Sequence, residues 1–319
     1  MSSLSYLEAT VVGLFQGVTE LFPVSSLGHS VLVPALIGGR WATDLDVSAP
    51  ESPYLAFIVG LHVATAAALL LFFWRDWMQI VTGFVTSVRY RRIETTGERL
   101  AWLIIVGTVP VGVCGLALEH TFRTTLGKPV PAAAFLVLNG VVLYAGERLR
   151  RRRDDSGVVT SANPMMAGAA DAKDARHGGV ATATTVDGID ERLARTSLPR
   201  GALIGAAQTL ALLPGISRSG VTMTAGLLRG LSHDEAARFS FLLATPVILA
   251  AGVLKVPDLF GPLGSGIGGQ VLAGSVASFV SAYLAVRFLT KYFHTRTMTP
   301  FAIYCVVAGV GSLLWLALR

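Results

Sequence analysis

QGVTELFPVSSLGHS (Gln16–Ser30) places a glutamate and a histidine beside apolar residues. The apolar segment before Pro23 is too short to cross a bilayer, which takes about 20 residues of helix. Gln16 and Glu20 are four residues apart and share one helix face. Pro23 disfavours helix at the residue before it, and Gly28 permits close approach of another backbone. The stretch therefore predicts a short membrane-embedded helix that ends in a polar turn.

The composition indicates a membrane protein with several spans. Of 319 residues, 52% are hydrophobic and 14% are charged, and the apolar residues form unbroken runs rather than the stripes of soluble helices. Runs long enough to span cover residues 54–74, 99–118, 131–148, 237–257, 270–289 and 299–318. The net charge of +6 is confined to certain loops, which is the pattern of membrane topology, so no nucleic-acid partner is expected. We therefore predict an all-α polytopic membrane protein with six full spans.

Basic loops stay on the cytoplasmic side of a membrane, and their positions predict the orientation. Arginine and lysine gather near residues 75–99, 148–153 and 287–296, and the intervening loops are poor in both. Each loop falls on the side that alternating spans require, so both termini are expected outside. Residues 149–200 have a polar composition without hydrophobic period and are expected to form a disordered cytoplasmic linker.

The linker separates two similar halves, residues 1–148 and 201–319. QTLALLPGISRSGVT (Gln208–Thr222) aligns without a gap on the opening stretch; the matched pairs are Gln16 and Gln208, Ser25 and Ser217, Gly28 and Gly220, and Ser30 and Thr222. Each copy precedes three predicted spans, so the second copy enters the membrane from the opposite face. This pattern predicts an inverted repeat in which each half has one re-entrant helix-turn-helix pair and three spans. Irregular backbone at membrane depth must be buried in protein or line a wet cavity, so we expect the two turns to meet.

The two turns together carry groups suited to phosphate chemistry. The second turn holds Ser217, Arg218, Ser219 and Thr222. Arginine recognises phosphate well, and the N-terminus of the helix after each turn is an anion site. Glu20 and His29 supply a carboxylate and an imidazole that can activate a nucleophile or hold a divalent cation. The structural alternative is that Glu20 and Arg218 simply pair to hold the turns together.

Two further polar features lie outside the turns. His62 lies inside the first predicted span. Either its ring hydrogen-bonds to a neighbouring helix and has a structural role only, or it contacts and orients a residue of the site. Ser232 precedes His233 and Glu235 and is predicted to cap a helix there.

The segments GVTELFPVSSLGHS and LLPGISRSGVT resemble the two signature stretches of the undecaprenyl-diphosphatase family, the bacitracin-resistance phosphatases of bacterial membranes. The residues that fit the signatures are Gln16, Glu20, Pro23, Ser25, Ser26, Gly28 and His29, then Pro214, Gly215, Ser217, Arg218, Ser219 and Thr222. The resemblance covers nearly the whole chain outside the linker. Gln16 stands where some relatives carry a first glutamate, and its neutral amide is the weaker metal ligand.

The resemblance implies an integral-membrane phosphatase that hydrolyses undecaprenyl diphosphate to undecaprenyl phosphate, recycling the lipid carrier of cell-wall synthesis and conferring bacitracin resistance. The implied catalytic residues are Glu20, Ser26, His29 and Arg218, and the implied substrate-binding residues are Ser25, Gly28, Ser217, Ser219, Thr222 and Gln16. The nucleophile is left open among Ser26, His29 and water. A divalent cation, Mg²⁺ or Ca²⁺, is expected on Glu20, because hard cations prefer oxygen ligands.

The expected partners are the polyprenyl substrate and membrane lipids, with a homodimer left open. The expected location is the bacterial plasma membrane, with the active site facing outside. The alternative function is a transporter or flippase that moves a lipid phosphate or another anion by alternating access.

Overall fold

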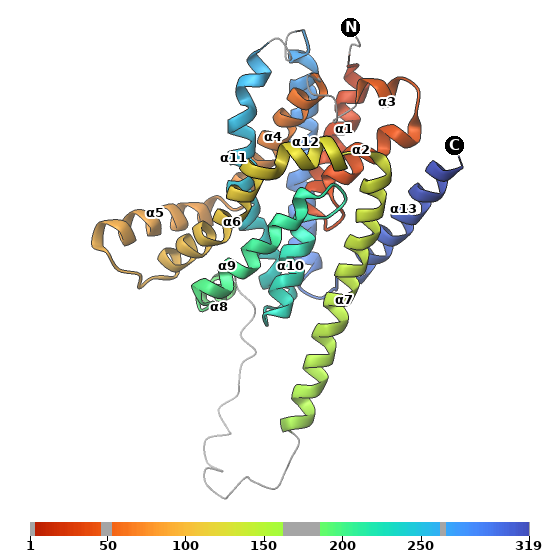
Figure 1. Cartoon of the computed structure of the whole chain (residues 1–319). Helices are drawn as coiled ribbons and strands as arrows, with labels where there is room; N and C mark the ends of the chain where they lie inside the picture. Colours follow the sequence, from red (N-terminus) through yellow and green to blue (C-terminus); the bar gives the residue numbers. More distant parts are fainter. Residues whose placement is uncertain (1–3, 46–52, 162–185, 262–265, 319) are drawn as a thin grey trace, which may run out of the picture.

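The computed structural model describes residues 4–45, 53–161, 186–261 and 266–318, and every regular element in these ranges is helical (Figure 1). The elements are α1 (Tyr6–Leu21), α2 (Ser26–Ile37), α3 (Arg40–Asp44), α4 (Pro53–Phe72), α5 (Trp74–Tyr90), α6 (Thr96–Leu126), α7 (Pro129–Ser161), α8 (Val186–Ala194), α9 (Leu198–Ala206), the 3-10 helix η1 (Ala207–Leu212), α10 (Arg218–Leu228), α11 (His233–Phe260), α12 (Gly268–Tyr292) and α13 (Thr299–Ala317). The predicted all-α class is confirmed for these residues.

The long helices coincide with the predicted spans. Helices long and apolar enough to cross a membrane cover Thr96–Leu118, Pro129–Arg153, His233–Leu254, Gly268–Tyr292 and Thr299–Ala317. Helix α4 passes the same test only together with α5, to which it is joined through a bend of 87°. The described residues thus contain 5 candidate spans, or 6 if the bent pair counts as one. The N-terminal end of α1 and the C-terminal end of α13 lie at one end of the bundle, and the C-terminal end of α7 lies at the other (Figure 1).

Helix α5 replaces part of a predicted basic loop. One face of α5 carries apolar side chains that are each more than half exposed: Trp74, Met78, Val81, Val85 and Val88. The opposite face buries Ile80, Gly83 and Ser87, and the helix packs against α6. An amphipathic helix has a stripe of apolar residues rather than an unbroken run, so a search for spans does not find it.

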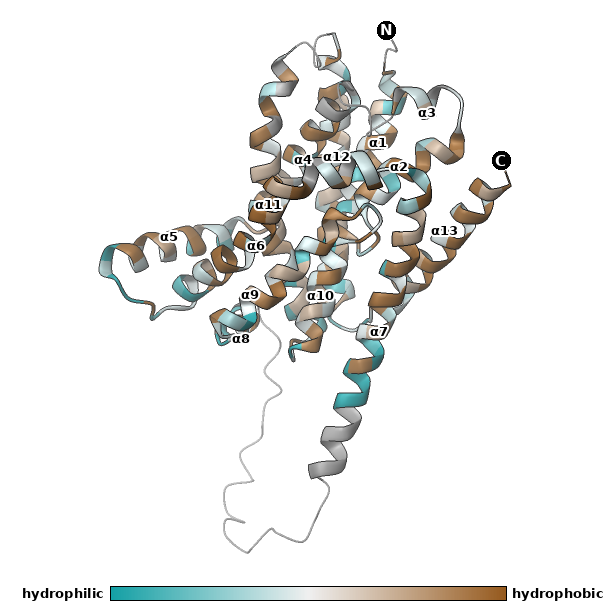
Figure 2. Ribbon diagram, in the orientation of Figure 1, coloured by the Kyte–Doolittle hydropathy of each residue, from teal (hydrophilic) through white to brown (hydrophobic). Residues whose placement is uncertain are grey.

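The predicted linker over residues 149–200 is helical at both of its described ends, and the expectation of disorder is wrong there. Helix α7 continues to Ser161, and its apolar part gives way to a polar part (Figure 2). Helix α8 packs with Ile189 and Leu193 buried. Residues 162–185 lie outside the described part of the chain.

A buried charged cluster fastens α8 to the bundle. Arg238 of α11 donates to both carboxylate oxygens of Asp190 in α8, from Nε at 2.6 Å and from Nη2 at 2.8 Å. The same guanidinium donates to Asp76 of α5. Polar side chains tie α5, α8 and α11 together, a contact that composition alone does not reveal.

The two halves of the chain pack mainly against each other. Helix α1 lies along α12, α9 along α6, α4 against α11, and α7 along α13. Two of these crossings are glycine contacts: a methyl group added to Gly13 would lie 2.2 Å from the carbonyl oxygen of Gly274, and one added to Gly205 would lie 2.2 Å from that of Gly107. Gly13 and Gly205 occupy aligned positions of the two copies. These crossings bring the helix that precedes each turn into the opposite half of the molecule.

Helix caps follow the sequence signals. The Ser232 hydroxyl accepts the amide hydrogen of Glu235 at 3.3 Å, and the Glu235 carboxylate accepts that of Ser232 at 2.9 Å. This capping box starts α11 as predicted.

Candidate active site

The two polar turns lie against each other, as expected. Ser25 caps α2 and Ser217 caps α10 in the same way, because each hydroxyl accepts the amide hydrogen of the glycine three residues on, Gly28 or Gly220, at 3.2 Å. Gly215 donates its N–H to the Ser25 hydroxyl at 3.2 Å. A methyl group added to Gly28 would lie 2.8 Å from Gly215 Cα, so the contact requires glycine.

Further hydrogen bonds join the turns to each other and to α7. The hydroxyls of Ser217 and Ser219 donate to the Phe22 carbonyl at 3.4 and 3.1 Å. Asn139 of α7 donates from Nδ2 to the Pro23 carbonyl and accepts from the Ser217 amide at Oδ1, both at 3.0 Å. Sequence analysis missed Asn139, whose only signal was an amide side chain inside an apolar span.

Glu20, near the end of α1, is the centre of the site. Its Oε1 accepts a hydrogen bond from Arg218 Nη2 at 2.8 Å. Its Oε2 accepts from the Ser26 hydroxyl, and from Gln16 Nε2 at 3.0 Å. His62 of α4 places Nε2 3.6 Å from the same oxygen. The structure therefore brings four of the predicted residues together and adds His62, for which the supporting role is the one that the geometry favours.

Arg218 is the first residue of α10 and bridges three elements. Besides its bond to Glu20, it donates from Nη1 to the Ala244 carbonyl of α11 at 2.9 Å. These bonds use two of the five N–H groups of a guanidinium and fix its plane. The Thr222 hydroxyl donates to the Arg218 carbonyl at 2.7 Å, so in this structure its hydrogen bond lies within its own helix.

His29, on α2, is held from both sides. Its Nδ1 lies 2.7 Å from the Ser25 carbonyl, and its Nε2 lies 2.7 Å from the Tyr304 hydroxyl of α13. A carbonyl only accepts, so Nδ1 carries the proton and Nε2 accepts from Tyr304. The two rings are stacked, with 8° between their planes. Of the groups left open as nucleophile, Ser26 bonds through its hydroxyl to Glu20 and does not bond to His29. Tyr304 gave no signal in the sequence.

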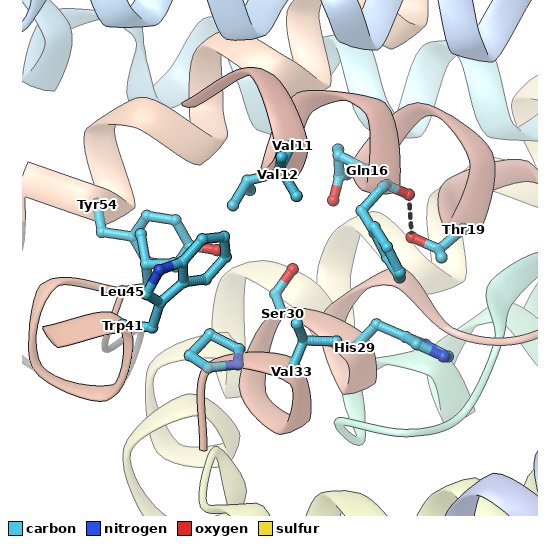
Figure 3. A pocket seen from close by; sticks show the side chains of 12 residues that line it. Val11, Val12, Gln16, Thr19, His29, Ser30, Val33, Trp41, Leu45 and Tyr54 are labelled. Carbon is cyan, nitrogen blue, oxygen red and sulfur yellow. Dashed lines mark hydrogen bonds between the residues drawn. The ribbon is translucent and has the colours of Figure 1, made fainter. Parts of the chain in front are cut away.

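A mostly apolar pocket opens beside these groups, between α1, α2, α3 and α4 (Figure 3). Trp41, Leu45 and Tyr54 lie toward one end of it, and Thr19 and His29 lie toward the other. The remaining lining residues are Val11, Val12, Phe15, Gln16, Ser30, Val33 and Pro34. An apolar pocket that ends at polar groups suits a ligand with a hydrocarbon part and a charged head.

Comparison with known proteins gives concordant results. A family model described as bacitracin resistance protein BacA matches residues 9–311. The chain is 72% identical to an undecaprenyl-diphosphatase of Mycolicibacterium paratuberculosis, over 99% of both chains. It is 55% identical to undecaprenyl-diphosphatase 1 of Frankia casuarinae, over 97% of both chains. It is 38% identical to an undecaprenyl-diphosphatase of Granulibacter bethesdensis, over 99% of this chain and 98% of the relative.

Proposed function

Since the chain belongs to the family of bacitracin resistance protein BacA, we propose that its paired turns form the active site of an undecaprenyl-diphosphatase. The chain is a multi-pass membrane phosphatase that releases the terminal phosphate of undecaprenyl diphosphate. This activity returns the lipid carrier to cell-wall synthesis and accounts for bacitracin resistance. The relatives described above are named undecaprenyl-diphosphatases, so the hydrolase interpretation is retained over the transporter.

The observation that carries the site assignment is the position of Glu20 between Ser26 and Arg218. The Ser26 hydroxyl already donates its hydrogen to the Glu20 carboxylate, which is the arrangement of a nucleophile and its base. Arg218, on the other carboxylate oxygen at 2.8 Å, is placed to neutralise the charge of a phosphoryl group. Phosphoryl transfer depends mostly on such positioning and charge neutralisation.

The proposed reaction has two steps. Ser26 Oγ attacks the terminal phosphorus and passes its proton to Glu20; the bond from phosphorus to the bridging oxygen breaks, and undecaprenyl phosphate leaves. Water then attacks the phosphoserine and gives a proton to the Tyr304 hydroxyl, which passes its own proton to His29 Nε2. The bond from phosphorus to Oγ breaks, Glu20 returns its proton to Oγ, and inorganic phosphate is released. Ser26 is favoured as nucleophile over His29, because the Nε2 lone pair of His29 already accepts a hydrogen bond from Tyr304 at 2.7 Å.

Substrate binding uses both the turns and the pocket. The N–H groups at the N-termini of α2 and α10, together with the guanidinium of Arg218, can bind the negatively charged phosphates. The apolar pocket residues Trp41, Leu45 and Tyr54 are suited to the first isoprene units. A divalent cation on Glu20 would neutralise phosphate charge as a Lewis acid.

We extend the proposal to an inverted repeat with two re-entrant pairs. The matching side-chain hydrogen bonds by which Ser25 and Ser217 cap their helices support it, as do the equivalent glycine crossings of α1 and α9. In this alignment Ser26 and Arg218 occupy the same position, the first residue of their helices. One copy then supplies the nucleophile and the other the positive charge. The basic loops support a cytoplasmic side at residues 149–161, and the family resemblance implies an active site that opens to the outside.

The test is phosphate release from undecaprenyl diphosphate and from farnesyl diphosphate by the purified chain in detergent. We expect activity from the wild type and losses of at least about a hundredfold in Glu20→Ala, Ser26→Ala and Arg218→Ala. Arg229→Ala, an exposed arginine that follows α10, is the matched control and should retain activity. Detergent has no second compartment, so release of phosphate excludes transport as its cause. Wild-type protein that binds substrate and releases no phosphate with any divalent cation would refute the assignment.

A further inference from the structure

A second cavity lies between α7, the start of α11 and the loop that joins α12 to α13, at the end of the bundle remote from the N-terminal end of α1 (Figure 1). Its volume is about 180 Å³. The charged and titratable side chains of its lining are those of Arg150, His233, Asp234, His294 and Arg296. They do not line the apolar pocket beside Glu20. The cavity is therefore separate from the candidate active site, and its lining is mainly polar.

A chain of hydrogen bonds holds Arg150 at the wall of this cavity. Glu147, which is buried on α7, accepts a hydrogen bond from His233 Nε2 at 2.8 Å. The Nδ1 atom of the same ring accepts from Arg150 Nη1, because a guanidinium only donates. The imidazole then carries one hydrogen and is neutral. The ring thus connects a buried carboxylate to the guanidinium and fixes the position of Arg150.

The charge of the lining is positive on balance. Arg150 and Arg296 contribute two guanidiniums, and a guanidinium stays protonated in proteins. The lining also contains the carboxylate of Asp234. Its Oδ1 accepts the amide hydrogen of Glu235 at 3.0 Å, and its Oδ2 lies 3.6 Å from His294 Nδ1. The positive N-terminal end of α11 also offsets the charge of this carboxylate, so the cavity favours an anion.

The position of the cavity indicates which anion it suits. A guanidinium can bind two oxygens of one phosphate group at once. The cavity lies beside the basic part of α7, Arg148–Arg153, and this polar part follows the apolar part of the helix (Figure 2). This side is the one that we propose to be cytoplasmic. Basic pockets between spanning helices on that side of a membrane bind the phosphate-bearing head groups of lipids.

Helix α12 offers an apolar surface for the tails of such a lipid. Four side chains that are 47–59% exposed lie four residues apart, on one side of this helix: Val276, Val280, Leu284 and Phe288. The centroid of the Phe288 ring is 5.6 Å from that of Tyr292, and Tyr292 directly precedes Phe293 of the cavity lining. The apolar stripe of α12 therefore leads to the cavity.

We propose that this cavity binds the phosphate group of an anionic phospholipid from the cytoplasmic leaflet. Arg150 and Arg296 bind the phosphate oxygens, and the acyl chains lie on the stripe of α12. The bound lipid bridges the two halves of the chain, because α7 belongs to the first half and α11 and α12 belong to the second. The site does not depend on the phosphatase activity, since it shares no residue with the paired turns.

Native mass spectrometry of the delipidated full-length protein in detergent tests the proposal. The probes are dioleoyl phosphatidylglycerol, which is anionic, and dioleoyl phosphatidylcholine, which has the same chains and no net charge. We expect the first molecule of phosphatidylglycerol to bind about tenfold more tightly than phosphatidylcholine, and the double variant Arg150→Gln/Arg296→Gln to lose this preference.

The matched control is Arg89→Gln/Arg92→Gln, which removes the same charge from exposed positions near the end of α5. It should keep the preference, and gel filtration reports whether each variant is folded. A preference that survives in Arg150→Gln/Arg296→Gln, or that is lost equally in the control, overturns the proposal. Displacement of phosphatidylglycerol by an equal concentration of inorganic phosphate would assign the cavity to free phosphate and also overturn it.

Photocrosslinking to the wild-type protein needs no variant. Phosphatidylglycerol with a diazirine in one acyl chain should label peptides of α12 that contain residues 276–288. Label confined to the pocket between α1, α2, α3 and α4 would place the lipid at the candidate active site and refute the second site.

Discussion

Replacing Arg218 by methionine tests whether the central ion pair holds the two turns together. The Arg218 and Glu20 side chains are only 12% and 8% exposed, and their charged atoms are 2.8 Å apart. At an effective dielectric constant of about 20, this separation corresponds to an attraction of about 6 kcal/mol. Desolvation of both charges opposes this attraction. Removal of one partner, however, leaves the other charge buried without a counter-charge, and such a change costs about 3–5 kcal/mol of stability. We therefore expect Arg218→Met to lower the free energy of unfolding by about 3–5 kcal/mol.

A double-mutant cycle isolates this effect from the loss of packing. Glu20→Gln keeps the shape of the side chain and removes its charge, so the double variant with Arg218→Met contains no stranded charge. We expect the double variant to be more stable than Arg218→Met alone, with a coupling energy above about 2 kcal/mol, and yet to be inactive. The measurement is equilibrium unfolding in mixed SDS and maltoside micelles, with phosphate release beside it. Additive losses of stability in the two single variants would refute the stabilising role of the pair.

Three further predictions follow from the contacts of the site and the bundle. Tyr304→Phe removes the hydroxyl that donates to His29 at 2.7 Å and keeps the stacked ring, so kcat should fall by about tenfold with KM unchanged; equal kcat would exclude a role for this bond. Gly205→Ala forces α9 away from Gly107 and should lower stability by about 1–3 kcal/mol, whereas Gly112→Ala, with nothing within 4 Å, should be neutral or slightly stabilising. In a cysteine-free background, Gly268→Cys should react with an impermeant maleimide on intact cells and Ser156→Cys should not; the reverse pattern would invert the proposed orientation.

The sequence predicts the residues around Glu20 well because they lie in two short stretches. These signals are local: the spacing of Gln16 and Glu20, the proline that ends the helix, and the aligned Ser25 and Ser217. Local signals can be recognised in the sequence without knowledge of the fold. The contact between the turns could also be predicted, since polar turns at membrane depth must be covered. The structure confirms this contact and the pairing of Glu20 with Arg218.

The partners that the sequence does not reveal come from distant helices. Asn139 and Tyr304 reach the turns from α7 and α13, and the periodicity of an apolar span does not tell which of its faces meets which turn. The nucleophile was left open among Ser26, His29 and water because the sequence does not tell which side chain the Ser26 hydroxyl contacts, and the structure shows that it bonds to Glu20.

The interleaved packing of the two halves also constrains how the chain matures. Helix α1 lies along α12, and α7 lies along α13. Helices that are synthesised early therefore cannot form these contacts until the later helices have been synthesised. Contacts between residues so far apart in sequence form late during synthesis. Until then, Glu20 lacks Arg218, and the newly inserted half exposes its glycine-lined surfaces to lipid. Enzymatic competence should therefore appear only once α12 and α13 have been synthesised and inserted.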